Sequence, residues 1–216
     1  MKTYGNLIEV YEKAIPFALC QKIIKYFDNN ENLVEDSNIE NFTDKGGYEH
    51  KHKNSLDYRK SKQITLKFPE ENTNLLNITG KEKESFDLLK ELTNHVALSL
   101  QKYIKTYPRL LPFKHTTNFE SVNLLRYKSG GGWYKFHADN DGVVISKRLV
   151  SIIIYLNDVE KGGETEFEYM DVDPIKPKQG DILIFPSGAP YSHRGNMPVS
   201  NNKYIAVFWL NRGKEI

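Results

Sequence analysis

His137 and Asp139, in the stretch "WYKFHADNDG" at residues 133–142, are two side chains whose types and spacing could serve chemistry. Residues two apart on a β-strand point to the same face, so the imidazole and the carboxylate could hold one metal ion together. The alternative is a surface strand end that runs into the turn "DNDG", whose residues favour turns. The pair alone does not decide between these two interpretations.

A third metal ligand is offered by His193, in "YSHRG". It follows the apolar run "DILIFP" and the turn "SGAP", which places it on the next strand back through a β-rich structure. Two imidazoles and one carboxylate leave coordination positions open for an organic co-substrate and dioxygen, an arrangement typical of Fe(II). A hydrolytic zinc site would more often use three protein ligands and a water molecule.

Lys203 lies ten residues after His193 and opens the run "KYIAVFWL". On a strand, Lys203, Ile205, Val207 and Trp209 share one face. A lysine on such an apolar face either lies at a solvated strand end or pairs with a buried anion. A dicarboxylate that chelates the metal at one end would present its other carboxylate to this lysine.

The elements that must position these residues begin at about residue 117, where the chain becomes a series of short strands. The predicted strands are "FESVNLLRY", "GWYKFHAD", "RLVSIIIYLN", "ETEFEYM", "DILIFPS", "YSHRG" and "KYIAVFWLN", separated by Gly-, Pro- and Asn-rich turns. Strands at this spacing predict an antiparallel sandwich or barrel. "LVSIIIYL" is apolar on both faces, which predicts a strand in the middle of a layered structure.

The N-terminal third predicts helices that pack outside this barrel. "IPFALCQKIIKYFDNN" has helical spacing, and "TGKE" at 79–82 has the form of a capping box before a second apolar stripe. The stripes consist of Phe17, Cys20, Ile24 and Phe27 in the first helix, and Phe86, Leu89, Leu92, Val96, Leu100 and Ile104 in the second. "KQITLKF" alternates like a strand. The polar segment 41–60 is either a cover over the site, with a Gly46-Gly47 hinge, or a plain insertion.

Composition narrows the class of protein. The 216 residues predict one domain, 1–216, and 30 basic against 28 acidic residues leave a net charge of +2. This balance gives no electrostatic case for nucleic acid or membrane binding. The chain has neither a long apolar run nor a start typical of a signal peptide, so we expect a soluble, cytoplasmic protein. A single cysteine, Cys20, excludes an internal disulfide framework and a cysteine-based zinc finger.

Taken together, residues 117–211 resemble the catalytic domain of the prolyl 4-hydroxylase-like 2-oxoglutarate- and Fe(II)-dependent dioxygenases. The resemblance rests on the ordered set "RYKSGGGWYKFHAD", "KRLVSIIIYLNDVEKGGETEF", "IKPKQGDILIFPSG" and "YSHRGNMPVSNNKYIAVFWL". H-x-D, a distal His and a Lys ten residues later form the site pattern of this family. "LIEVYEKAIPFALCQKII" also resembles the opening strand and helix of the family.

The resemblance implies a mainly β fold with flanking helices, in which a double-stranded β-helix (jelly roll) spans 117–211 and a support region spans 1–116. It implies that His137, Asp139 and His193 hold Fe(II), and that Lys203 pairs with the distal carboxylate of 2-oxoglutarate. Further positions match by role: Tyr127 and Thr165 bind the co-substrate, and Arg148, Trp209 and Tyr134 line the substrate side. The alternatives are a core position for Tyr127, a sheet-face position for Thr165, a surface charge for Arg148 and simple packing for Trp209.

The implied reaction is hydroxylation of a C–H bond, by default in peptidyl proline, with dioxygen consumed and succinate and CO2 released. Ascorbate is a further expected cofactor, and a peptide or protein is the expected partner, without nucleic acid. This chain departs from the family at "SGGG", where one extra residue precedes the H-x-D, at Asn211, where a His is usual, and in the unmatched loop 41–60. These departures leave open a free amino acid, another protein side chain or a nucleobase as substrate. A non-enzymatic, cupin-like metal-binding module is the other alternative, and Lys203 argues against it.

Overall fold

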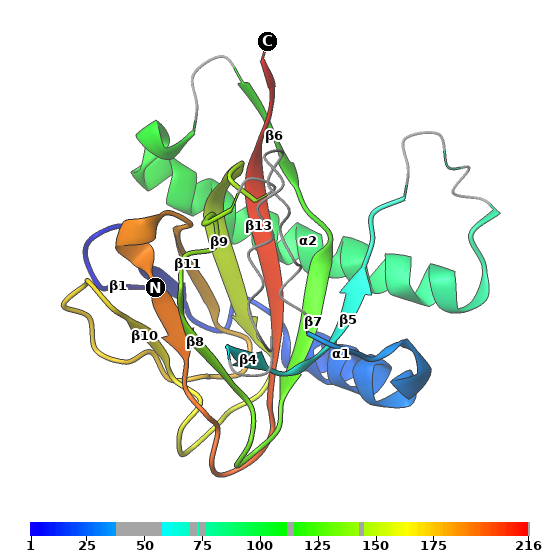
Figure 1. Ribbon diagram of the computed structural model, residues 1–216. Coiled ribbons are helices and arrows are strands. Elements are labelled where there is room, and N and C mark those ends of the chain that lie inside the picture. The colour runs from blue at the N-terminus through cyan, green and yellow to red at the C-terminus, as the bar shows by residue number, and fades with distance from the viewer. Residues whose placement is uncertain (38–57, 70–72, 74–76, 112–114, 143–144, 216) are drawn as a thin grey trace, which may run out of the picture.

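The computed structural model describes residues 1–37, 58–69, 73, 77–111, 115–142 and 145–215. Most of the predicted covering segment 41–60, including Gly46 and Gly47, therefore lies outside the described residues. Within the described part, two antiparallel sheets and two long helices form the fold (Figure 1). No helix in the described ranges is both long and apolar enough to span a membrane.

The larger sheet contains the middle strands of the molecule. Along the sheet the order is β1-β2-β11-β9-β13-β7-β5-β3, and β6 pairs with β13. The bounds are Lys2–Thr3 for β1, Glu9–Tyr11 for β2, Glu35–Asp36 for β3, Lys62–Leu66 for β5, His115–Phe119 for β6, Val122–Tyr127 for β7, Arg148–Tyr155 for β9, Ile182–Pro186 for β11 and Lys203–Glu215 for β13. The predicted strand "FESVNLLRY" corresponds to β7 together with the last residue of β6, and both of these strands pair with β13.

The smaller sheet has the order β10-β12-β8-β4. Its strands are Arg59–Lys60 for β4, Trp133–His137 for β8, Thr165–Phe167 for β10 and His193–Gly195 for β12. Phe167 from this sheet packs in one buried cluster with Ile205 and Val207 from the larger sheet. The two sheets therefore face each other across a shared interior.

The side chains on the two faces of β9 and β13 pack into two different hydrophobic clusters. On β13, Ala206 and Phe208 belong to the cluster on the helix side, whereas Ile205 and Val207 belong to the cluster between the sheets. The period of two along a strand produces this division. The prediction that "LVSIIIYL" is buried on both faces is confirmed, since β9 is buried from Val150 onwards.

The helices α1 (Phe17–Asn29) and α2 (Gly80–Thr106) cover the outer face of the larger sheet, as predicted. Two details differ from the prediction. Phe17 is 68% exposed, because the buried stripe of α1 is formed by Leu19, Cys20, Ile23, Tyr26 and Phe27. Thr79 precedes α2 in an extended conformation but makes no side-chain cap, so the capping box is absent. Short 3-10 helices lie at Glu31–Leu33, Pro108–Leu110 and Ala189–Tyr191.

The N-terminal third supplies strands to both sheets, beyond the two predicted in "LIEVY" (β2) and "KQITLKF" (β5). β5 pairs with β7, and β4 pairs with β8 so that Arg59 lies opposite Tyr134. The mainly β architecture with flanking helices is confirmed. The N-terminal strands bring residues from 59 to 65 beside the residues that the sequence marks for chemistry.

Candidate active site

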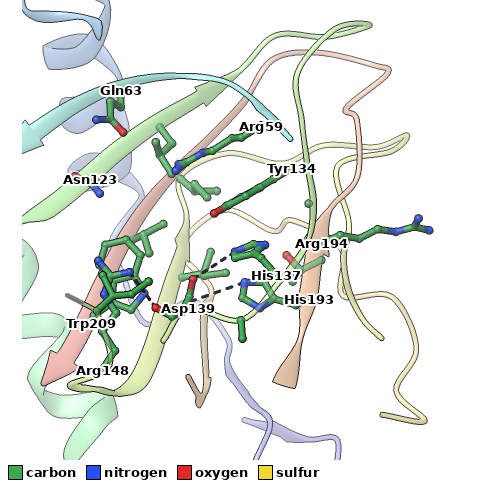
Figure 2. A pocket seen from close by; sticks show the side chains of 18 of the residues that line it. Arg59, Gln63, Asn123, Tyr134, His137, Asp139, Arg148, His193, Arg194 and Trp209 are labelled. Atoms are coloured by element: carbon green, nitrogen blue, oxygen red, sulfur yellow. Dashed lines mark hydrogen bonds and ion pairs between the residues drawn. The ribbon is translucent and has the colours of Figure 1, made fainter. Parts of the chain in front are cut away.

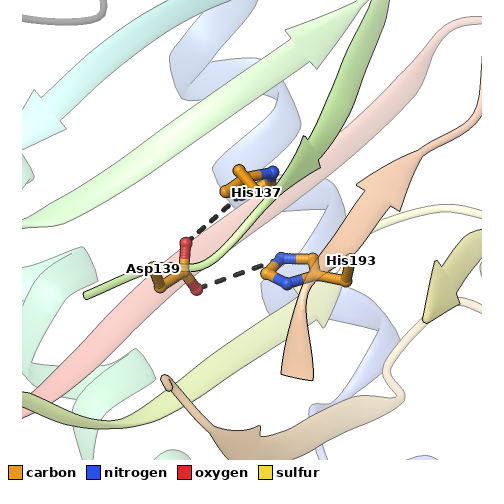
Figure 3. A group of neighbouring side chains, drawn as sticks. All are labelled: His137, Asp139 and His193. Carbon is orange, nitrogen blue, oxygen red and sulfur yellow. Dashed lines mark ion pairs between the residues drawn. The ribbon is translucent and has the colours of Figure 1, made fainter. Parts of the chain in front are cut away.

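Three predicted metal ligands meet where the strands of the smaller sheet end. His137 is the last residue of β8, Asp139 follows it directly, and His193 opens β12 opposite His137. His137 Nε2 lies 3.3 Å from Asp139 Oδ1, and His193 Nε2 lies 4.0 Å from Asp139 Oδ2 (Figure 3). Their ligand atoms all lie within 4.8 Å of one another. Such a cluster can hold one metal ion.

The backbone fixes which ring nitrogen of each histidine faces the cluster. His137 Nδ1 lies 2.9 Å from the carbonyl oxygen of Lys135, and His193 Nδ1 lies 3.1 Å from that of Tyr191. A carbonyl can only accept, so each Nδ1 donates, and in the neutral imidazole Nε2 is then the atom that keeps a lone pair for a metal.

Burial and neighbouring charges set the protonation of the cluster. Burial, together with the neighbouring His137, lowers the pKa of His193 to about 4. Burial alone would raise the pKa of Asp139, but the two histidines hold it well below its usual range. At neutral pH the imidazole of His193 is thus neutral and the carboxylate of Asp139 is ionised. A donor set of two imidazoles and one carboxylate fits a divalent cation such as Fe(II).

A cavity of about 540 Å³ opens beside these ligands, between the two sheets. All nine residues singled out in the sequence line it, and Figure 2 shows how several of them converge. These are Tyr127, Tyr134, His137, Asp139, Arg148, Thr165, His193, Lys203 and Trp209. The structure therefore brings together every residue that the sequence predicted for the site.

Lys203 is buried in this cavity although it opens β13, with only 2% of its surface exposed. Its Nζ donates to the carbonyl oxygen of Gly163 at 2.6 Å and lies 5.7 Å and 5.5 Å from the ring centres of Tyr127 and Tyr155. Burial lowers the pKa of Lys203 to about 7. The solvated strand end is thus excluded, and a buried cation faces the interior of the cavity.

Tyr127 and Thr165 lie beside this lysine. Tyr127 pairs directly with Lys203 in the sheet, despite the extra residue in "SGGG". The hydroxyl groups of Thr165 and Tyr155 lie 2.8 Å apart, which fixes the Thr165 side chain at the cavity wall. Tyr127 and Lys203 come from the larger sheet and Thr165 from the smaller one, so both walls contribute to this end of the cavity.

Arg148 and Trp209 form another part of the wall. The guanidinium carbon of Arg148 lies 3.7 Å from the ring centre of Trp209, and its Nη1 donates to the carbonyl oxygen of Asp139 at 3.1 Å. Glu120 accepts from Arg148 Nε at 2.9 Å and from Nη2 at 2.7 Å, and Asn211 Nδ2 donates to the same carboxylate. Arg148 is therefore held inward by an ion pair, and it also supports the backbone of a predicted metal ligand.

Tyr134 stacks on His137, with ring centres 3.6 Å apart and planes 17° apart. On the other face of Tyr134 lies the guanidinium of Arg59, 4.7 Å from the ring centre. Arg59 and Glu120 are two charged cavity residues that the sequence did not single out, although Arg59 lies within the segment 41–60 predicted as a possible cover. "YRKS" and "FESV" have no local motif, since both residues reach the cavity only through strand pairing.

Comparison with known proteins agrees with this geometry. Residues 122–211 match the model of the 2OG-Fe(II) oxygenase superfamily. Prolyl 4-hydroxylase 13 from Arabidopsis thaliana is 32% identical over 117 residues, which cover 43% of this chain and 43% of that protein. Probable prolyl 4-hydroxylase 3 of the same plant is 25% identical over 175 residues, 63% of this chain and 58% of the relative. The chain thus spans between two fifths and three fifths of the length of the first curated relatives it matches.

Solved structures share the fold over nearly the whole chain. The viral collagen prolyl hydroxylase of Paramecium Bursaria Chlorella virus-1, solved as a 2OG complex, matches with a TM-score of 0.63 and 20% identity, covering 97% of this chain and 98% of that one. A prolyl hydroxylase from Trichoplax adhaerens, solved with a hypoxia inducible factor peptide fragment, matches with a TM-score of 0.65 and 16% identity. The match covers 96% of this chain and 84% of that one.

These structures confirm the predicted double-stranded β-helix core. The predicted resemblance is confirmed as well: residues 122–211 match the model of the 2OG-Fe(II) oxygenase superfamily, and the chain is similar to prolyl 4-hydroxylases in part of its sequence and in its fold.

Proposed function

We propose that this chain is an Fe(II)- and 2-oxoglutarate-dependent dioxygenase that hydroxylates peptidyl proline and releases succinate and CO2. The observation that carries the proposal is one cavity of about 540 Å³ in which a buried two-histidine, one-carboxylate cluster and a buried lysine face the same interior. A binding module has no need for the lysine, because a buried cation without an anion is unfavourable. The relatives named as prolyl 4-hydroxylases support proline as the substrate.

His137, Asp139 and His193 would hold the iron, which when bound supplies the centre at which 2-oxoglutarate and dioxygen react. In the neutral imidazoles, the bonds from Nδ1 to the backbone would leave Nε2 as the atom whose lone pair is available to the iron. Lys203 would bind the distal carboxylate of 2-oxoglutarate by a charge-assisted hydrogen bond. Tyr127 and Thr165 would complete the polar surroundings of that co-substrate.

The substrate would lie against the wall formed by Tyr134, Arg148 and Trp209. The face of Trp209 that Arg148 does not cover is suited to an apolar ring such as that of proline, whereas Tyr134, stacked between Arg59 and His137, would meet the substrate with its edge or its hydroxyl group. Arg148 can position the chain that carries this ring, because Glu120 fixes its guanidinium at two points. Fixing the substrate in this way limits the reaction to one carbon and excludes water from it.

A substrate screen with detection of succinate tests the proposal. The purified protein is supplied with Fe(II), 2-oxoglutarate and ascorbate, and is offered proline-rich peptides, the same peptides with alanine for proline, free amino acids, and nucleic acid. We expect succinate above the uncoupled level, and a mass increase of one oxygen, with the proline peptides. His193→Ala is the matched control without turnover. Stimulation by free amino acids or nucleobases alone would reassign the substrate, and no succinate under any condition would contradict the enzyme.

A further inference from the structure

We propose that Arg59 is a second anion-binding residue of the cavity, and that it receives a carboxylate carried by the hydroxylated substrate. The inference rests on the proposed function and narrows its substrate class. It predicts a proline next to an acidic side chain, or a proline whose own α-carboxylate is free.

Strand pairing places Arg59 close to the predicted metal ligands. β4 lies against β8 with Arg59 opposite Tyr134, and the guanidinium, the phenol ring and the imidazole of His137 form one stack. Figure 2 shows the three side chains above one another at the cavity. Arg59 is only 9% exposed and lines the same cavity as Lys203. Its charge therefore acts on whatever fills this space.

Neutral groups hold Arg59 in place. Its Nε donates to Ser61 Oγ at 3.1 Å, and Ser61 in turn donates to Ser37 Oγ at 2.7 Å. Tyr127 is a further polar neighbour of the guanidinium. These groups orient the side chain but bring no negative charge to it. The carboxylate that acts on Arg59 electrostatically is that of the predicted metal ligand Asp139, which lies beyond ion-pair distance.

Arg59 differs in this respect from Arg126, Arg148 and Arg194, whereas the other two arginines of the described chain, Arg109 and Arg212, form no ion pair there but are exposed. Arg148 pairs with Glu120 at 2.7 Å, Arg194 with Glu166, and Arg126 with Asp28 at 3.4 Å. No carboxylate among the described residues lies within ion-pair distance of Arg59, although it is the more buried side chain. A buried guanidinium without a counter-ion is costly, and its planar fork is suited to a carboxylate.

The charges of the loaded cavity point to the same conclusion. Fe(II) carries two positive charges, Asp139 one negative charge and 2-oxoglutarate two, so Lys203 brings this group to neutrality. The pair of Arg148 and Glu120 is neutral by itself. Arg59 is then the unbalanced charge among these groups, since the further carboxylate of the cavity lining, that of Asp141, is exposed to solvent. A substrate with one negative charge near the reacting carbon would neutralise Arg59.

Paired substrates test the inference. One pair is a proline peptide with Glu or Gln beside the proline, and the other is a peptide that ends in proline as a free acid or as an amide. We expect the wild-type protein to prefer the charged member of one pair by ten- to a hundredfold in kcat/KM, as a charge-assisted bond of about 1.5–3 kcal/mol implies. The pair that shows the preference identifies the source of the carboxylate.

Variants assign the preference to one residue. Arg59→Gln should abolish it, Arg59→Lys should retain part of it, and Arg126→Gln, which loses an ion pair outside the cavity, should leave it intact. Thermal unfolding checks that each variant is folded. Equal use of charged and neutral substrates by the wild type would overturn the inference, as would a preference that survives in Arg59→Gln.

A binding measurement separates this inference from the proposed function. The Mn(II)- and 2-oxoglutarate-loaded protein is titrated with N-acetylproline, with its amide, and with acetyl-Pro-Glu and acetyl-Pro-Gln amides. Tighter binding of an acid than of its amide, lost in Arg59→Gln, supports the anion site even if proline is not hydroxylated. Absence of that difference overturns the site even if proline is hydroxylated. A loss of 2-oxoglutarate affinity in Arg59→Gln, with the acid preference unchanged, would assign Arg59 to the co-substrate and also overturn the inference.

Discussion

Replacing Lys203 should separate co-substrate binding from metal binding. The ammonium group is buried, and its one hydrogen bond to the protein in the described structure is to the carbonyl oxygen of Gly163. Loss of a charge-assisted bond worth about 1.5–3 kcal/mol should weaken 2-oxoglutarate ten- to a hundredfold in Lys203→Ala. Affinity for Mn(II) should change little, because Lys203 is not one of the ligands. Lys203→Arg should restore binding only in part, since a planar guanidinium needs more room than an ammonium group.

The lowered pKa of Lys203 predicts that the affinity for 2-oxoglutarate falls as the pH rises above neutral. In the free protein burial lowers the pKa of Lys203 to about 7, whereas a bound carboxylate favours the protonated form. Binding of 2-oxoglutarate above neutral pH must therefore take up a proton, about 0.9 per site at pH 8. Its affinity should fall about tenfold for each further pH unit. In Lys203→Arg the guanidinium stays charged, so this part of the pH dependence should vanish.

Calorimetry with Mn(II)-loaded protein measures both effects. Titrations of 2-oxoglutarate at pH 8 in two buffers with different ionisation enthalpies give the number of protons taken up, and titrations at several pH values give the slope. The reasoning is refuted if the heat is independent of the buffer, or if Lys203→Ala saturates at the wild-type concentration of 2-oxoglutarate.

The remaining predictions concern the metal ligands, a turn and stability. His137→Ala, Asp139→Ala and His193→Ala should each weaken Mn(II) binding in calorimetric titration, and unchanged affinity in two of the three would contradict the assignment. Gly162→Ala should lower the free energy of unfolding in urea more than Gly130→Ala. Both glycines have positive φ, which costs about 1–2 kcal/mol in alanine, but only at Gly162 would the new methyl group meet a carbonyl oxygen, that of Met197, adding about 1–3 kcal/mol. Because the pKa of Lys203 is lowered on folding, the unfolded chain binds more protons between the folded and unfolded pKa values, so this lysine should make stability rise with pH there. Lys203→Met should flatten that slope in thermal or urea unfolding.

The sequence predicted those site residues that a short motif or the hydrophobic pattern of their own strand indicates. The H-x-D pair, His193 and Lys203 sit at strand ends that hydrophobic patterns mark, and the period of two correctly placed Ile205, Val207 and Trp209 on the face of Lys203. The stripe of α2 was predicted well at its centre, where packing on the sheet demands apolar residues. The first residue of α1, Phe17, was predicted as buried because spacing alone does not show where a helix leaves the sheet.

Residues placed by long-range pairing could not be predicted in this way. Arg59 reaches the cavity because β4 pairs with β8, more than seventy positions further along the chain. Glu120 is fixed by Arg148 across a gap of 28 residues. Neither contact produces a periodic pattern in the sequence, since a two-residue strand such as β4 is too short to show an alternation of apolar and polar residues.

One continuous strand, β13, sets the spacing between the two ends of the cavity. Lys203 and Trp209 are six residues apart on it, which at about 3.3 Å per residue corresponds to roughly 20 Å. Substitutions at positions 209 and 211 can therefore change the cavity at that end of β13, while Lys203 at the other end keeps its contacts. Deleting a single residue between them would have the opposite effect, because it would turn one end of the strand toward the helices. The number of residues between Lys203 and Trp209 is therefore as much a part of the cavity as the side chains that line it.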